Sequence, residues 1–427
     1  MRVAFITSHF PFDGKESFLC AELEQLAREF EVTIVPAVSA MRHNSFPRFE
    51  RASRQTRPPF SIRTLGDAFQ EFVRDPVAAT RALWAVVCGP RSIRATFRNI
   101  LIYPKALAVT RQLRAQGVNH IHAYWLSTPA TIAYVASRLT GIPWSATGHR
   151  WDLVDSNISS LGRPRAGFLT TAAFVRTISE EGRRLVAGSF GSGGSPKIVV
   201  AHLGVRVSSL APQRAAHGAH LRLACIASFV PVKGHAYMLA ALQKVKREGI
   251  GFSCAMFGVG PLRDALARTI VKLDLGDCVE IVAQLPHAEL VRKLAEGEFD
   301  VAILTSVDNG PKECEGIPVS LMEAMAVGIP VIATRSGSVG ELVDDGNGIL
   351  ADPKDVDAIA AAVTALAADA GLRRTLGNRA RARIAAGFNV EKTAAIVARL
   401  IAESAATSSY DYQRQDKRGN QDDRARA

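Results

Sequence analysis

The sequence predicts an α/β protein that contains two doubly wound parallel sheets, one in each half of the chain. The first half opens with the apolar run Arg2–Thr7, a segment with helical apolar spacing, and a second apolar run, Glu31–Pro36. This strand-helix-strand order is typical of a parallel sheet. The run Arg222–Ser228 repeats the opening pattern of a basic residue, apolar residues and a serine, which indicates a second domain of the same class.

The length of 427 residues is too great for one hydrophobic core and suits two domains. We predict an N-terminal domain over residues 1–207 and a C-terminal domain over 222–404. The segment 208–221 is rich in Ala, Gly and His without apolar periodicity and is therefore predicted to be the linker. Residues 405–427 are polar and lack a period, which predicts a disordered tail.

Alternating strands and helices are predicted along both halves. In the first half, after an Arg-rich helical stretch, the predicted strands are His120–Ala123, Pro143–Thr147, Val175–Ile178 and Lys197–Ala201, with a helix at Pro129–Thr140. In the second half, the predicted strands are Ser253–Phe257, Val279–Val282, Val301–Leu304, Pro330–Ala333 and Gly348–Leu350, and the predicted helices are Val319–Ala326, Ala358–Ala368 and Leu372–Ala386.

The positive charge of the chain, +12 overall, lies almost entirely in its first half. Between Arg42 and Arg114 there are 14 basic residues and four acidic ones, interleaved with aromatic side chains such as Phe69 and Trp84. One interpretation is a basic amphipathic surface for an anionic membrane or a lipid-phosphate acceptor. Ordinary solvated helix faces are the open alternative, and no nucleic-acid-binding module is recognisable.

The cysteine pattern indicates a reducing compartment, and the apolar pattern bears on targeting and membrane insertion. The six cysteines form no Cys-x-x-Cys pair, so we expect neither disulfides nor a zinc knuckle. No apolar run is long enough to span a bilayer, and the opening run is too short for a signal-peptide core. We expect a cytoplasmic protein that is either free or peripheral on the cytoplasmic face of a membrane.

Two carboxylates, Glu315 and Glu323, flank the predicted start of a helix. Pro318 suits the first helical turn, and Gly316 allows a ligand to approach the backbone closely. Because helix N-terminal amides attract anions, a diphosphate would fit at this turn, with the carboxylates bonding hydroxyl groups on either side. A capped helix with incidental acidic residues is the alternative.

These residues carry a family resemblance. Glu315-x7-Glu323, followed by Ala-Met-Ala-Val-Gly-Ile-Pro-Val, resembles the retaining glycosyltransferase family 4, as do Val230-Pro-Val-Lys233-Gly and Phe257-Gly-Val-Gly-Pro. The N-terminal Phe10-Pro-Phe-Asp-Gly-Lys-Glu and Thr147-Gly-His149-Arg-Trp-Asp152 resemble members that build exopolysaccharides. The resemblance spans the chain and implies a GT-B fold, in which two Rossmann-like domains face a cleft and the C-terminal helix packs back on the N-terminal domain.

The resemblance also implies residue roles. Lys233 would neutralise the donor diphosphate, Glu323 would bind the ribose, Glu315 would bind hydroxyls of the transferred sugar, and His149 would contact the donor sugar or reacting centre. Further donor-binding candidates are Gly316, Ile317, Pro318, Val319, Ser228, Gly258 and Gly260. For acceptor or phosphate contacts the candidates are Gly14, Lys15, Glu16 and Asp152. His120, His122, His217, His220 and His235 are interpreted as structural.

A fixed ammonium and oriented amides stabilise the charge of a departing nucleoside diphosphate, so no metal or cofactor is expected. The nucleotide sugar is then a substrate. One departure from the family is Ser228, which stands where an arginine is usual, and Arg335 or an N-terminal arginine would have to replace that charge. Val259 likewise replaces a glutamate that is common in the Gly-x-Gly turn.

We therefore predict a retaining, metal-independent glycosyltransferase that moves a sugar from a UDP- or GDP-sugar to a saccharide acceptor, in particular a lipid-linked one in exopolysaccharide or cell-surface glycan synthesis. The enzymatic alternatives are a nucleotide-sugar epimerase or a glycosyl phosphorylase, since fold alone does not decide function. A non-catalytic nucleotide-sugar sensor or scaffold is the alternative that Ser228 motivates.

Overall fold

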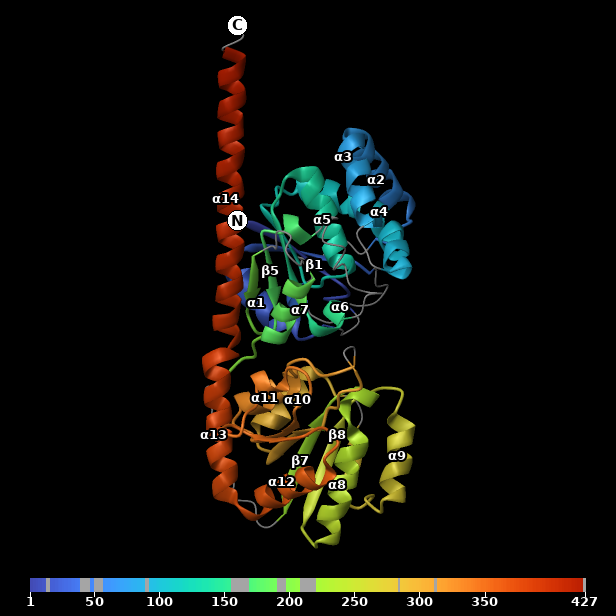
Figure 1. Cartoon of the computed structure of the whole chain (residues 1–427), viewed down its shortest axis with the longest axis vertical. Helices are drawn as coiled ribbons and strands as arrows, with labels where there is room; N and C mark the ends of the chain where they lie inside the picture. The colour runs from blue at the N-terminus through green and yellow to red at the C-terminus, as the bar shows by residue number, and fades with distance from the viewer. Residues whose placement is uncertain are drawn as a thin grey trace. The chain divides into compact units, whose positions relative to one another are not determined.

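The computed structural model divides the chain into two compact units (Figure 1). Unit 1 comprises Met1–Ala201 and Ala394–Ala427, and unit 2 comprises His202–Thr393. The structure describes residues 1–12, 16–38, 47–49, 57–88, 92–154, 169–189, 197–207, 220–282, 285–310 and 313–424, and the side chains up to residue 407.

Unit 1 contains a six-stranded parallel sheet in the order β2-β1-β3-β4-β5-β6. Its strands are β1 (Arg2–Thr7), β2 (Glu31–Pro36), β3 (His120–Ala123), β4 (Trp144–Gly148), β5 (Phe174–Thr177) and β6 (Ile198–Val200). Its helices are α1 (Leu19–Glu29), α2 (Ile62–Arg74), α3 (Pro76–Cys88), α4 (Ile93–Ala115), α5 (Thr128–Thr140), α6 (Arg150–Val154), α7 (Glu180–Gly188) and the part of α14 (Val390–Arg424) from Ala394 onward. Strands β1, β3, β4 and β5 are almost wholly buried, as expected where helices cover both faces of a parallel sheet.

Unit 2 repeats this architecture with the sheet order β12-β11-β10-β7-β8-β9, again all parallel. Its strands are β7 (Leu221–Ile226), β8 (Phe252–Phe257), β9 (Val279–Val282), β10 (Val301–Leu304), β11 (Val331–Thr334) and β12 (Ile349–Ala351). Its helices are α8 (His235–Arg247), α9 (Arg263–Lys272), α10 (His287–Ala295), α11 (Val319–Ala326), α12 (Val356–Ala368) and α13 (Ala370–Gly387). The prediction of two doubly wound domains is confirmed.

The boundaries of the units differ from the predicted domains. Unit 2 takes in residues 202–207, and residues 394–404 belong to unit 1 because Val397, Leu400 and Ile401 share a core with strand β1. The predicted linker lies outside the described residues except for His220 and Leu221, and Leu221 already begins β7. The expectation that the C-terminal helix packs on the N-terminal domain is confirmed.

The predicted disordered tail, 405–427, is helical as far as Arg424, where α14 ends. The sequence of this stretch contains no proline and is rich in Ala, Arg, Asp and Gln, which a helix tolerates.

A chain of hydrogen bonds crosses the core of unit 1 from β4 to α14. Ser404 donates to the carbonyl of Ile401, so its hydroxyl oxygen must accept from Nδ1 of His120, at 2.9 Å. Nε2 of His120 then accepts from Ser145, and Ser145 accepts from Nδ1 of His122. This ordering needs a neutral His120 ring, in agreement with burial, which lowers the pKa of His120 to about 3.

Arg176 is the largest charged side chain that is fully buried in unit 1. It forms an ion pair of 2.7 Å with Glu22, which is equally buried. The same Glu22 oxygen accepts from the hydroxyl of Tyr124, and Nε of Arg176 donates to the carbonyl of Ala201. The pair joins α1 to β5, and removal of one partner leaves the other as an uncompensated charge.

We therefore expect Arg176→Met to destabilise unit 1 by about 3–5 kcal/mol, because Glu22 then stays buried without its cation. Arg183→Met, which breaks the half-exposed pair with Glu180, is the matched control and should change stability by less than about 1 kcal/mol. Hydrogen exchange of β1 and β5 amides measures both. Equal protection in the two variants would contradict a structural role for the buried pair.

Candidate functional site

The predicted site residues of unit 2 lie at the place where the strand order of its sheet reverses. Strand β7 has β8 on one side and β10 on the other, so the chain winds away from β7 in two directions. The loops that follow β7 and β10 carry Lys233 and Glu315, respectively. Ligands of doubly wound sheets bind outside the carboxyl ends of the strands at this switch point.

Lys233 and Glu315 form a close ion pair in which Nζ lies 2.6 Å from Oε2 of the carboxylate. Both side chains are largely buried. Ser306, at the end of β10, donates to the same carboxylate oxygen at 2.7 Å. An ammonium has three protons, so the bond to Glu315 leaves two for a second anionic partner. The lysine is thus held in place without being saturated.

The backbone around Glu315 is fixed by the loop after β11. The Glu315 amide donates to Oγ of Ser336, which in turn donates to Asp308, and the Glu315 carbonyl accepts from the amide of Ser338. Gly337 has φ +51°, and a Cβ there would lie 1.9 Å from the Glu315 carbonyl oxygen. Only glycine permits this approach.

The segment Gly316, Ile317, Pro318 and Val319 leads from Glu315 into α11. Pro318 is the residue before the helix, and no side chain caps this end of α11. The first amides of a helix have no intrahelical partner and carry partial positive charge. An uncapped helix start beside a lysine is therefore a site for an anion.

Gly258 and Gly260, in the turn after β8, shape the loop that carries Lys233. A Cβ on Gly258 would lie 2.0 Å from the Ala227 carbonyl oxygen, and one on Gly260 would lie 2.5 Å from that of Phe229. Their role in this structure is to let two turns pack together. Ser228 lies on the exposed side of the same loop.

Glu323, on α11, accepts a hydrogen bond of 2.6 Å from Nε2 of His287 at the start of α10. This hydrogen bond raises the pKa of His287. The carboxylate is mostly buried, whereas the imidazole is about half exposed. The structure therefore gives Glu323 an ordered orientation.

Arg335 was the suggested replacement for the arginine that is absent at Ser228. Its guanidinium lies 3.4 Å from the carboxylate of Asp352 and 3.8 Å from that of Asp345. Two carboxylates thus already balance its charge. Lys233 is the cation that the described residues place at the switch point beside Glu315.

In unit 1 the strand order reverses between β1 and β3, and His149 follows the next strand, β4. The His149 ring stacks on Trp125 at 4.2 Å between centroids and meets Phe18 edge-on at 5.5 Å. Burial, with a smaller contribution from Arg176, lowers its pKa to about 3. Among the described residues neither ring nitrogen has a hydrogen-bond partner, so the neutral ring keeps one donor and one acceptor for a ligand.

Asp152 is a fully buried carboxyl group that positions the loop of His149. Its two oxygens accept from the amides of His149, at 2.7 Å, and Leu126, at 2.6 Å. Burial raises its pKa to about 8, against the opposing effect of these two hydrogen bonds. Asp152 therefore acts on His149 through the backbone and does not face an acceptor with a free carboxylate.

Glu16 also turns inward. Its carboxylate accepts from the amides of Ser8, His9 and Phe10 after β1, and from the indole of Trp125. These bonds tie the first loop of unit 1 to the aromatic neighbour of His149. Gly14 and Lys15, predicted beside it, lie outside the described residues.

Several residues of these two sites were not singled out by sequence. They are Ser306, Ser336, Asp308, His287, Trp125 and Phe18. Ser306 and Ser336 follow buried strands, a position that predicts the carboxyl edge of the sheet. His287 and Phe18 have no comparable local signal, because their contacts cross between distant elements.

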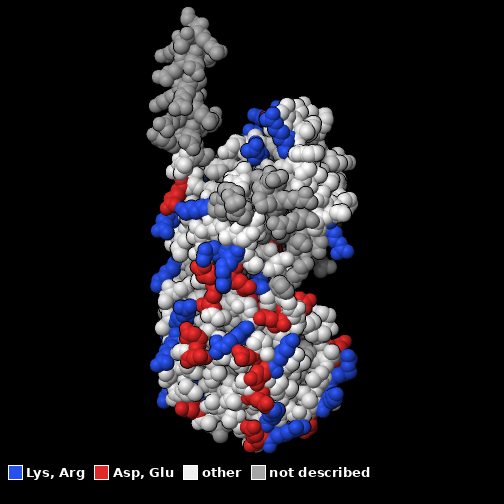
Figure 2. All heavy atoms as spheres, viewed as in Figure 1, with Lys and Arg blue, Asp and Glu red and all other residues white. Residues whose placement is uncertain are grey.

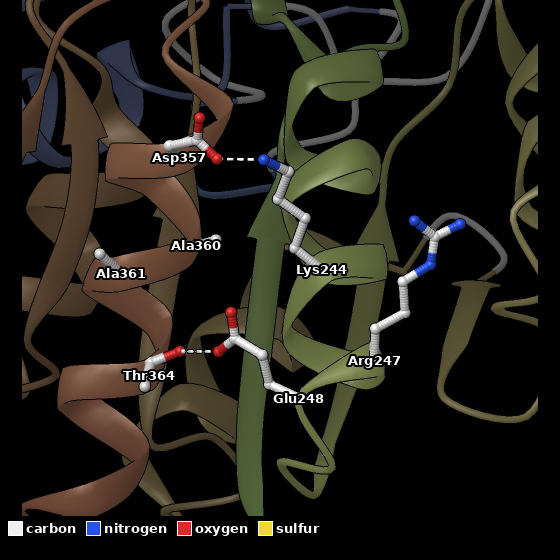
Figure 3. A pocket seen from close by; sticks show the side chains of 7 residues that line it. All are labelled: Lys244, Arg247, Glu248, Asp357, Ala360, Ala361 and Thr364. Atoms are coloured by element: carbon white, nitrogen blue, oxygen red, sulfur yellow. Dashed lines mark hydrogen bonds and ion pairs between the residues drawn. The ribbon is translucent and has the colours of Figure 1, made fainter.

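A groove of about 450 Å³ lies between α8 and α12 in unit 2. Figure 3 shows Lys244 and Asp357 pointing toward each other across it, and Thr364 bonded to Glu248. Lys244 and Glu248 lie at the C-terminal end of α8, about 15 Å along the helix from its start, which follows Lys233. Among the described residues, no cluster of three His, Cys, Asp or Glu side chains is arranged to hold a metal ion.

Gly234 offers a test of the geometry that holds Lys233. It has φ +64°, and a Cβ would lie 1.8 Å from the carbonyl oxygen of Thr305, at the end of β10. We expect Gly234→Ala to push the loop after β7 away from Glu315 and to destabilise unit 2 by more than about 2 kcal/mol. Denaturant unfolding measures the change.

The control is Gly249→Ala, which has a similar φ of +76° but no atom within 4 Å of the added Cβ. This substitution should lower the free energy of unfolding only by the strain of a left-handed backbone, about 1–2 kcal/mol. Equal effects of the two substitutions would show that the close approach to Thr305 does not matter.

His149 predicts a pH dependence of stability. Its folded pKa of about 3 lies below the unfolded value of 6.5, so below about pH 6.5 the unfolded chain binds a proton that the folded chain does not. The contribution is complete above pH 6.5 and is lost as pH falls toward 3. His149→Phe should remove up to ~1.4 kcal/mol per pH unit from that slope.

Denaturant unfolding at several values between pH 6.5 and 4.5 measures the slope, with the half-exposed His9→Phe as control. The phenylalanine variant keeps the backbone amide that bonds Asp152, so the opposite pH dependence of that carboxyl is unchanged. An unaltered slope would mean that His149 is accessible to protons in the folded protein.

Comparison with known proteins finds a family match within unit 2. Residues 213–383 match the family of Glycosyl transferases group 1. The colanic acid biosynthesis glycosyltransferase WcaL of Salmonella typhimurium is 33% identical over 48% of this chain and 51% of its own length. The amylovoran biosynthesis glycosyltransferase AmsK of Erwinia amylovora is 34% identical over 40% of this chain and 41% of its own length. The matched part thus spans about half the length of these relatives or less.

Solved structures share the fold of the whole chain. A sucrose-phosphate synthase from Thermosynechococcus elongatus superposes with a TM-score of 0.71 at 18% identity, over 95% of this chain and all of that one. Anabaena HepE, solved with UDP-glucose, gives 0.67 at 16% identity, over 94% and 100%. The two parallel-sheet units are those of the GT-B fold, and residues 213–383 match the Glycosyl transferases group 1 family.

Proposed function

We propose that the protein is a retaining glycosyltransferase that moves a sugar from a nucleotide-sugar donor to a saccharide acceptor. The observation that carries the proposal is the Lys233–Glu315 pair beside the uncapped start of α11, at the switch point of the group 1 domain. This arrangement offers positive charge and free amides to a diphosphate, with a carboxylate next to them.

The donor diphosphate binds at the start of α11 in this proposal. Lys233 uses its two remaining protons on the phosphates, and the amides of Ile317 and Val319 supply further donors. Both stabilise the charge that grows on the phosphate oxygens as the bond to the sugar breaks, so no metal ion is needed. Glu315 then accepts from hydroxyls of the transferred sugar, and Glu323 accepts from the ribose.

Retention follows if the acceptor hydroxyl attacks from the face that the diphosphate leaves. The bond between the anomeric carbon and the phosphate oxygen breaks, the bond to the acceptor oxygen forms, and the acceptor proton moves to the leaving phosphate oxygen. No protein nucleophile takes part. His149, neutral at pH 7 and with neither ring nitrogen bonded among the described residues, is proposed to contact the donor sugar or the reacting centre.

Similar proteins support a nucleotide-sugar donor and a saccharide acceptor, but they do not identify which nucleotide sugar is used. Similar proteins are named for colanic acid and amylovoran biosynthesis, one is a GDP-mannose-dependent mannosyltransferase of Mycolicibacterium smegmatis, and a structure with the same fold holds UDP-glucose. The donor is accordingly proposed to be a UDP- or GDP-sugar and the acceptor a lipid-linked saccharide at the cytoplasmic face of a membrane. No helix among the described residues has the length and hydropathy to cross a bilayer.

Calorimetric titration with UDP- and GDP-sugars in EDTA tests the donor site. We expect one donor to bind, and Lys233→Gln and Glu323→Gln to weaken that binding about 10- to 100-fold, since each removes a charged hydrogen bond. Lys272→Gln, exposed on α9, and Glu289→Gln, partly exposed on α10, are the matched controls and should bind as the native chain does.

Product analysis with the donor that binds then tests the chemistry. Transfer to a saccharide acceptor in EDTA, with the anomeric configuration kept, is the expected result. Strict dependence on a divalent cation, or donor binding that none of the site variants weakens, would refute the proposed site.

A further inference from the structure

Large apolar side chains that are exposed to solvent are concentrated on α2, α3 and α4 of unit 1. Of sixteen such side chains among the described residues, eleven lie between Phe60 and Leu101. Ile62 and Ile93 are 90% and 89% exposed, and Trp84 is 70% exposed. Exposure of many apolar side chains on helices that pack on one another marks an interaction surface.

The exposed apolar residues of helix α2 follow a regular spacing in the sequence. Its apolar residues Ile62, Leu65, Phe69 and Val73 recur at spacings of three and four, so they form one stripe along the helix. That stripe faces solvent. The opposite face, which packs on the protein, carries Thr64, Ala68 and Glu71. Helix α2 thus turns its apolar stripe to solvent and its more polar face to the rest of unit 1, the reverse of the usual arrangement.

Polar contacts beneath the helices hold this orientation. Glu71 is 1% exposed and forms an ion pair of 2.8 Å with Arg114 at the end of α4. Asn99 of α4 is also buried and bonds the carbonyl of Val86 and the hydroxyl of Thr131. Rotation of α2 or α4 to bury its apolar stripe would break these buried bonds, which is costly.

Basic residues accompany the apolar ones. Arg63, Arg74, Arg81 and Arg94 are exposed on α2, α3 and α4, and within the described part of the chain none of the four forms an ion pair of 4.0 Å or less. On the face seen in Figure 2, the end of unit 1 that carries α2 and α3 shows blue spheres and no red ones. Aromatic and aliphatic side chains beside arginines suit the interface of an anionic bilayer.

We infer that α2, α3 and α4 form a membrane-docking face, which inserts Phe69, Trp84 and Phe97 among the lipids of an anionic bilayer and sets its arginines against the head groups. The face lies on the surface of the bilayer and does not span it. This inference deepens the proposed function, because a lipid-linked acceptor would be met at such a surface.

A second copy of the chain is the other occupant that an apolar face admits. In a two-fold symmetric dimer each copy presents the same patch, so four arginines would meet four arginines. Asp75 is the exposed acidic residue of these three helices, since Asp67 is paired with Arg57 and Glu71 is buried. The charge of the face therefore favours an anionic lipid surface over self-association.

Flotation with vesicles tests the inference. We expect the full chain to bind vesicles of phosphatidylcholine with 30% phosphatidylglycerol (about one anionic lipid in three) and to bind pure phosphatidylcholine far less. Replacing Arg63, Arg74, Arg81 and Arg94 with Gln should lower the partition coefficient about fivefold per residue, and raised salt should do the same for the native chain. Phe69→Ser with Trp84→Ser should lower it by at least about tenfold.

Val271→Ser and Arg268→Gln, both exposed on α9 of unit 2, are the matched controls and should leave vesicle binding unchanged. Donor titration of every variant separates this question from the donor site, because a docking variant should bind donor normally. The inference is overturned if the native chain ignores anionic vesicles, if it binds neutral ones equally, or if the controls weaken binding as much. A dimer that Phe69→Ser with Trp84→Ser converts to monomer would assign the face to self-association instead.

Discussion

The reversal of strand order in each parallel sheet is the constraint on which the sites of this protein depend. Where β7 separates β8 from β10, and β1 separates β2 from β3, the connecting chains leave in opposite directions and the carboxyl ends of the strands stay uncovered. Loops that are distant in sequence meet there, so Lys233 lies 2.6 Å from Glu315, 82 positions later in the chain. Neither residue could be placed by its own loop alone.

Several carboxyl groups near the carboxyl ends of the strands have hydrogen-bond partners within the protein. Glu315 is bonded by a lysine and a serine, Glu16 by three backbone amides, and Asp152 by two. Among the groups with unused bonding capacity in the described residues are the ammonium of Lys233, the first amides of α11 and the ring of His149. In the proposed function, these groups are the ones that meet substrate, and the saturated carboxyl groups position them.

Much of the fold could be predicted from sequence, because buried parallel strands are continuous apolar runs whose bounds shift by only one or two residues. The site was predicted where a motif is local, as in Glu315 to Glu323. Contacts between distant loops could not be predicted from the sequence. They are the hydrogen bonds of Ser306 with Glu315 and of His287 with Glu323, and the ring contact of Trp125 with His149. Sequence also cannot tell which way a polar side chain turns. Glu16 and Asp152 were expected to meet an acceptor, yet their carboxyl groups bond backbone amides, because unpaired amides beside a strand end must be satisfied.

The central claim is that a nucleoside diphosphate binds at the switch point of unit 2, on Lys233 and the start of α11. Hydrogen–deuterium exchange of the full chain with and without UDP and GDP, in EDTA, tests it most directly. The account predicts that one nucleotide slows exchange in the segments 228–235 and 315–322, while the far end of α8 and its groove with α12 exchange at the same rate as before. Protection that is confined to that groove, or spread over unit 2 without a maximum at these two segments, would contradict the account.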